Sequence, residues 1–78
     1  MARAFRFGNY GVYVLPERGQ PHHLPHAHVM RRNQRVASVY LWTLTVYHQC
    51  EPLPAQLVER IRIEQPALLD LWVELNDG

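Results

Sequence analysis

The chain has 78 residues, of which 47% are hydrophobic and 19% are charged, and this composition excludes an intrinsically disordered protein. The single cysteine, Cys50, excludes an internal disulfide and a cysteine-cluster metal site, and no apolar run is long enough to cross a membrane. We therefore expect one domain, 1–78, located in the cytoplasm, whose small core favours a homo-oligomer or a small cognate partner protein.

The formal net charge of +1 conceals opposite charges in the two parts of the chain. Residues 1–50 hold six arginines and one acidic residue, whereas residues 51–78 hold two arginines and six acidic residues. The sequence has no lysine, so arginine alone carries the permanent positive charge. A guanidinium group suits bidentate contact with phosphate or carboxylate, although a GC-rich genome explains the same bias more simply.

Two short strand-like runs begin the chain. Residues 2–7 and 10–15 alternate their side chains around the turn signal Gly8-Asn9, which indicates a hairpin or one strand with a bulge. Residues 16–21 are rich in proline and glycine, so we expect a loop there.

The next segment is rich in histidine. Residues 26–31 can extend as a strand that places His26, His28 and Met30 on one face and Arg31 on the other. The polar residues 32–35 predict a turn.

Residues 36–47 are the most strand-like part of the chain, because β-branched and aromatic residues dominate and there is no glycine or proline. Both alternating faces are largely apolar, so one face can take helices and the other needs a second layer or another subunit. Twelve residues exceed a typical strand, which predicts a bend or a break near Trp42 to Leu44.

Two amphipathic helices are expected after Pro54 and after Pro66, since proline favours the first turn of a helix. Their apolar residues recur at helical spacing and comprise Leu57, Val58, Ile61, Leu68, Leu69, Trp72 and Leu75. The order of elements predicts an α+β fold, in which an antiparallel sheet of three to four strands is followed by two C-terminal helices packed on one face.

Three segments of the chain carry a family resemblance. They are His22-His23-Leu24-Pro25-His26-Ala27-His28-Val29, then Val39-Tyr40-Leu41, and finally Leu68-Leu69-Asp70-Leu71-Trp72-Val73-Glu74. With them the chain resembles the small bacterial domain-of-unknown-function family 4160. The resemblance implies a compact α+β domain. It also implies a gene that often lies beside a second small protein, in pairs that look like toxin–antitoxin modules.

The histidine-rich stretch offers the groups needed for acid–base chemistry on RNA. One imidazole can remove a 2′-hydroxyl proton, another can protonate the leaving oxygen, and a guanidinium can stabilise the developing charge. The candidate catalytic residues are His22, His26, His28, Arg31 and Arg35. Tyr13 or Tyr40 could provide an aromatic platform, and this chemistry needs no cofactor.

A metal site is an alternative for the same stretch. His26 and His28 would share a strand face, and His22 could bring a third imidazole from the loop. Three histidines with an open position are typical of a catalytic site for zinc or another divalent metal. However, Glu17 is the one acidic residue in the first fifty, which leaves little to orient the ligands.

A structural role for the histidines is the third possibility, because imidazole nitrogens can bond backbone groups where a loop enters a strand. His22 and His28 fit this role. The chain would then be a non-enzymatic homo-oligomeric assembly or binding module whose contact uses residues 36–47. The function that we expect is that of a toxin-like component of a two-protein module, acting through protein contact and through RNA binding or cleavage.

Overall fold

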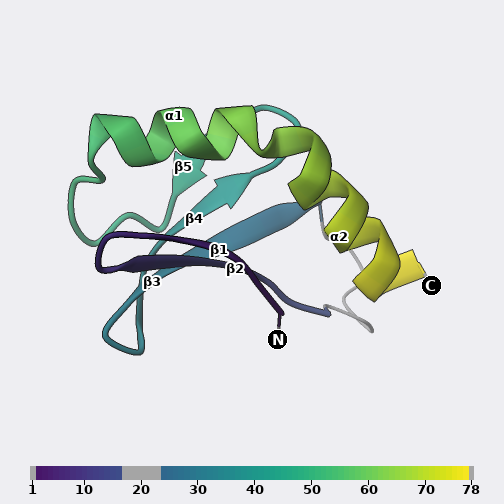
Figure 1. The fold of residues 1–78 in the computed structure, drawn as a ribbon, viewed down its shortest axis with the longest axis horizontal. Coiled ribbons are helices and arrows are strands. Elements are labelled where there is room, and N and C mark those ends of the chain that lie inside the picture. Colours follow the sequence, from purple (N-terminus) through teal and green to yellow (C-terminus); the bar gives the residue numbers. More distant parts are fainter. Residues whose placement is uncertain (1, 17–23, 78) are drawn as a thin grey trace.

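The computed structural model describes residues 2–16 and 24–77, which form a five-stranded sheet and two helices (Figure 1). In chain order the elements are β1 (Ala2–Phe7), β2 (Tyr10–Val14), β3 (His26–Arg31), β4 (Gln34–Tyr40), β5 (Val46–Tyr47), α1 (Ala55–Ile63) and α2 (Gln65–Asp77). Each strand pairs antiparallel with the next one in the chain. The predicted α+β fold is confirmed, with five strands in place of three to four.

The additional strand arises because the apolar segment 36–47 turns back on itself. The chain turns after β4, and Leu44 takes a positive φ of 61°. The Leu44 amide donates to the Tyr40 carbonyl at 2.8 Å, and the Tyr40 amide donates to the Thr45 carbonyl at 2.9 Å. The predicted bend is therefore confirmed, and the residues beyond it form β5.

Two tight hairpins join β1 to β2 and β3 to β4. Gly8 opens the first turn with a φ of 58°, while Arg32 and Asn33 form the second with φ values of 53° and 66°. In the second turn both central residues have positive φ, which is typical of a type I′ turn, whose twist matches that of the paired strands. The second turn is shorter than the predicted 32–35 turn, because Gln34 and Arg35 already belong to β4.

α1 lies over one face of the sheet, and α2 continues from it along the end of the strands (Figure 1). Leu57 and Ile61 of α1 and Leu68 and Trp72 of α2 are buried there. The buried strand residues of the same core include Val12, Val14, Ala27, Val29, Ala37 and Val39. Every second residue of a strand points to the same face, so these apolar side chains lie together and pack against the helices. Neither helix in the described part of the chain is long and apolar enough to cross a membrane.

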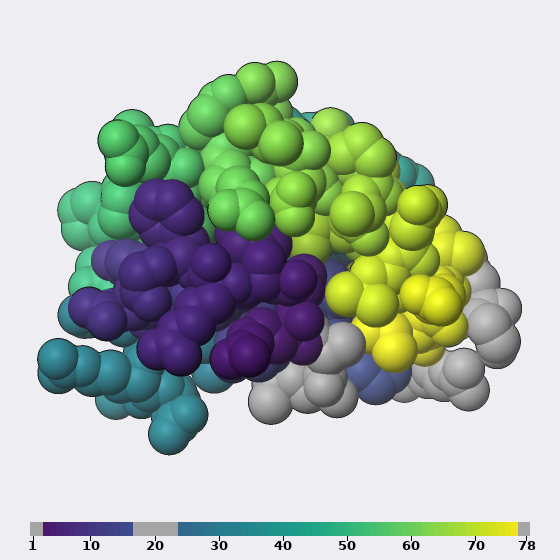
Figure 2. Space-filling view, viewed as in Figure 1, coloured from purple at the N-terminus to yellow at the C-terminus, as the bar shows by residue number. Residues whose placement is uncertain are grey.

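The edge strand β1 closes one side of this core. Figure 2 shows β1, in purple, directly against α1, in green. The guanidinium carbon of Arg60 lies 4.9 Å from the centroid of the Phe5 ring, so a cation–π contact joins the two elements.

The apolar residues of β4 are buried without a second subunit. Val36, Ala37 and Val39 are 5%, 0% and 2% exposed within the single chain. Ala37 and Val39 lie on the face that packs against the helices, so the second layer or subunit expected for the other face stays a prediction.

Candidate functional site

Two rows of paired residues cross the face of the sheet that no described helix covers. The first row, from β1 to β5, consists of Arg3, Tyr13, His28, Ser38 and Tyr47. The second row, from β1 to β4, consists of Arg6, Gly11, Met30 and Arg35. These rows and the adjacent turn residues Asn9, Arg32 and Asn33 make up what we term the helix-free face.

The two histidines of β3 make local contacts. His28 is 7% exposed, and its Nδ1 lies 3.2 Å from Oγ of the fully buried Ser38. Nδ1 of His26 lies 2.7 Å from the Leu24 carbonyl oxygen, which requires this nitrogen to be the donor. The two ring centroids are 5.0 Å apart, and His26 also lies 4.9 Å from the Trp72 ring. These contacts fix the entry of the chain into β3, as a structural role requires.

The predicted catalytic residues do not all gather in one place. His22 lies outside the described residues. Arg35 lines the same hollow as His28, on the helix-free face. Arg31 lies on the opposite side of β3 and pairs with Glu51, whose Oε2 accepts a hydrogen bond from Arg31 at 2.9 Å. The structure therefore brings His26, His28 and Arg35 to one side of the sheet and commits Arg31 to another contact.

The metal alternative involves the same histidines. Within residues 2–16 and 24–77, no three His, Cys, Asp or Glu side chains lie close enough together to hold a metal ion. The predicted ligand set of His22, His26 and His28 extends beyond these residues and stays a prediction. Because Nδ1 of both His26 and His28 already has a near neighbour, a metal ion would have to bind at Nε2 of each ring.

Three arginines outside the helix-free face are paired with glutamates. The pairs are Arg31–Glu51, Arg60–Glu64 and Arg62–Glu59. In the last pair, hydrogen bonds from the Arg62 side chain hold the pKa of the Glu59 carboxyl below its usual value, and the same contact raises the pKa of Arg62. The acidic C-terminal part of the chain therefore neutralises the arginines closest to it.

The arginines of the helix-free face have a different environment. Arg3, Arg6, Arg32 and Arg35 have no acidic partner among the residues that the structure describes. The Arg6 side chain donates to the Gly8 carbonyl at 3.2 Å, a contact that leaves its charge uncompensated. Within the described part of the chain, the arginines of the first half that lack an acidic partner thus lie on one surface.

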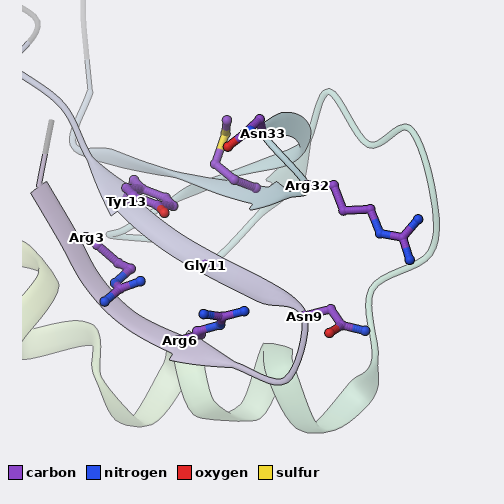
Figure 3. A pocket seen from close by; sticks show the side chains of 8 residues that line it. Arg3, Arg6, Asn9, Gly11, Tyr13, Arg32 and Asn33 are labelled. Carbon is purple, nitrogen blue, oxygen red and sulfur yellow. The ribbon is translucent and has the colours of Figure 1, made fainter.

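Two adjoining hollows lie on this surface. The first, which we term the arginine hollow, has a volume of about 250 Å³ and is lined by Arg3, Arg6, Asn9, Gly11, Tyr13, Met30, Arg32 and Asn33 (Figure 3). Figure 3 shows Arg3 and Arg6 extending from β1 along the strands, while Arg32 points away from them at the turn. The described residues of its lining supply guanidinium and amide donors and no carboxylate, so this hollow suits an anion.

The second, which we term the apolar hollow, has a volume of about 380 Å³ and is lined by Tyr13, Leu15, His28, Met30 and Arg35. Tyr13 and Met30 line both hollows and form the wall between them. Together the hollows reach the size of small-molecule sites, which is about 300–1,000 Å³.

Sequence reasoning anticipated Tyr13, His28 and Arg35 but missed Arg3 and Arg6. The register of β1 shifts between Arg3 and Phe5, and this irregularity puts Arg3 opposite Tyr13 and Arg6 opposite Gly11. The charge asymmetry of the sequence was the available signal for these two arginines.

Comparisons of the chain with protein-family models, with curated proteins and with solved structures found no match. The resemblance to family 4160 therefore stays a prediction.

Proposed function

We propose that this chain binds RNA through the helix-free face, as the toxin-like component of a two-protein module. The observation that carries the proposal is a group of four arginines that have no acidic partner among the described residues, namely Arg3, Arg6, Arg32 and Arg35. Guanidinium groups bind phosphate oxygens bidentately. A concentrated basic surface is the electrostatic feature expected of a nucleic-acid-binding protein.

The dimensions of the helix-free face suit a polymer of phosphates. Arg6 on β1 and Arg35 on β4 belong to one row that spans three strand spacings, or about 14 Å. Successive phosphates of one strand in a duplex are about 3.4 Å apart along the axis. The row is therefore long enough to meet more than one phosphate of the same chain.

Binding is better supported than cleavage. Catalysis by His26 and His28 would require both imidazoles to reach one phosphodiester group. His28 is 7% exposed and contacts Ser38, while His26 contacts the Leu24 carbonyl and the Trp72 ring. The arginines and Tyr13, in contrast, line hollows at the surface.

The binding of a fluorescently labelled single-stranded RNA, measured by anisotropy over a range of salt concentrations, tests this function. Affinity should fall steeply with salt, because bound phosphates release counterions. The double variant Arg3→Gln and Arg6→Gln should bind more weakly and show a slope of log K against log salt that is shallower by roughly 1.4. The control Arg62→Gln removes one positive charge from α1, where Glu59 already neutralises it.

Two results would overturn the proposal. One is a native protein whose RNA affinity does not depend on salt. The other is a control variant, Arg62→Gln, that weakens binding as much per charge as the Arg3 and Arg6 substitutions do.

The toxin-like part of the proposal rests on the resemblance to family 4160. Expression of the native chain in bacteria should arrest growth, and the Arg3→Gln and Arg6→Gln variant should relieve the arrest while Arg62→Gln does not. Absence of growth arrest would overturn this part and leave RNA binding standing. Arrest relieved by His26→Ala, together with shortening of the labelled RNA by the native protein, would show that cleavage accompanies binding.

A further inference from the structure

We infer that the ring of Tyr13 is a platform for one unstacked base of a single-stranded RNA, with the adjoining phosphate held by Arg3 and Arg6. The inference rests on the proposed RNA binding and names its substrate class. It assigns the arginine hollow to the phosphate and the apolar hollow to the base.

The position of the Tyr13 ring depends on Gly11. A Cβ atom placed on Gly11 would lie 2.7 Å from Cε1 and 3.2 Å from Cζ of Tyr13, which means that the ring lies over the Gly11 backbone. A side chain on a strand usually stands roughly perpendicular to the sheet. Because glycine has no side chain, the tyrosine can lean along the strand and rest on the sheet.

A ring in this position can offer its outer side to another flat group. Tyr13 is half-buried and forms the wall shared by the two hollows. Tyr40, the other tyrosine considered as a platform, stacks on Tyr47 with ring centroids 4.2 Å apart and an angle of 17° between the planes. Tyr13 is therefore the tyrosine that the fold combines with the arginines.

The chemistry of the two hollows matches the two parts of a nucleotide. Arg3 lies opposite Tyr13 in register, so a phosphate at Arg3 and a base on Tyr13 would be one strand spacing apart, or about 4.8 Å. The apolar hollow adds Leu15 and Met30 as apolar walls and Arg35 as a planar cation. Aromatic rings and guanidinium planes are the groups on which proteins stack unpaired bases.

The same geometry disfavours a duplex. In double-stranded RNA the bases are stacked on one another, and proteins recognise its shape, its phosphates and its 2′-hydroxyls. A tyrosine ring that rests on a sheet can meet the flat side of a base only where that base has left its stack. The surface should therefore prefer a single strand to a duplex of the same sequence.

Affinities for a single-stranded RNA and for its duplex, measured by anisotropy at several salt concentrations, test the inference. Tyr13→Leu should weaken single-strand binding about tenfold and leave the salt slope and the duplex affinity unchanged. Gly11→Ala should act in the same direction, because the new methyl group displaces the ring while every charge and every ring atom remains. Tyr13→Phe is the matched control and should bind like the native protein, since the aromatic face is retained.

The outcomes separate the inference from the function on which it rests. If Tyr13→Leu binds single-stranded RNA as tightly as the native protein while the Arg3→Gln and Arg6→Gln variant does not, the base platform is overturned and RNA binding stands. Equal native affinity for single strand and duplex also overturns the platform. Native protein that binds neither RNA overturns both. Circular dichroism of each variant establishes that lost binding is not lost folding.

Discussion

The two faces of the sheet are built from the same strands and differ in what they do. On the helix-covered face, Val12 and Val29 are paired and fully buried. One residue away on the helix-free face, Tyr13 and Met30 are half-buried and line hollows beside arginines. Successive residues of a strand point to opposite faces, so one face can be optimised for packing while the other carries charge.

Arg31 and Arg35 show this difference within one residue type. Arg31 lies on the helix-covered side, and its Nε is 2.8 Å from Oε1 of Glu51, an oxygen that is buried and receives no hydrogen bond. Arg35 lies on the helix-free side and lines the apolar hollow. The first arginine therefore serves the stability of the fold, and the second is available to a ligand.

The largest expected effect belongs to the buried core. Trp72→Ala should lower the free energy of unfolding by about 3–5 kcal/mol, because the ring is buried between α2 and the sheet. That loss is much of the total for a domain of this size. Urea unfolding followed by circular dichroism measures it. Val73→Ala, at a neighbouring residue that is 51% exposed, is the control and should cost far less; equal losses would contradict the assignment of the core.

A smaller effect on stability is expected when Arg31 and Arg35 are replaced in turn. Arg31→Gln should lower the free energy of unfolding by about 1–2 kcal/mol, because the buried oxygen of Glu51 loses its charged partner. Arg35→Gln should change it by no more than about 0.5 kcal/mol but should weaken RNA binding. Urea titrations and anisotropy on the two variants provide the comparison. Equal destabilisation by both substitutions would remove the distinction between the faces.

The smallest expected effect concerns the surface of α1. Hydrogen bonds from Arg62 lower the pKa of Glu59 in the folded chain below the ordinary value of 4.5. The resulting stabilisation is present above that value and is lost as the pH falls through the folded pKa. Thermal unfolding of Glu59→Gln should therefore show a slightly lower Tm than the native chain at pH 7 and no difference in strong acid. Asp70→Asn, which also removes one negative charge from a helix, is the control and should not show this dependence on pH. A difference in Tm for Glu59→Gln that is the same at every pH would argue against the Glu59–Arg62 pair.

The fold was largely predictable because apolar alternation and the placement of glycine and proline carry most of its information. Gly8 marks the first hairpin, and Pro54 and Pro66 lie at the starts of the helices. The exception is the turn between β4 and β5. Leu44 adopts a positive φ there, and a leucine gives no sequence signal for that conformation. The length of the segment therefore predicted a bend or a break near Trp42 to Leu44, but not a turn that returns the chain as a fifth strand.

The site was less predictable, because it depends on register. Strict alternation would put Arg3 on the same face as Phe5, and the irregularity between them instead puts Arg3 and Arg6 on one face. No feature of the sequence of residues 2–7 predicts this register shift. The separation of Arg31 from His26 and His28 follows from alternation alone, so the sequence did contain the information that divides the predicted catalytic set.

The shortness of β5 affects how the protein behaves at high concentration. A sheet edge with unpaired amide and carbonyl groups is a template on which other chains can add strands, and this is a route to fibrils. β5 has two residues, so it offers very few amide and carbonyl groups with which a strand of another chain could pair. The other edge strand, β1, is interrupted by its register shift and does not present a flat, regular ladder. Neither edge strand therefore favours the addition of a strand from another molecule, which lowers the tendency of the sheet to aggregate at high concentration.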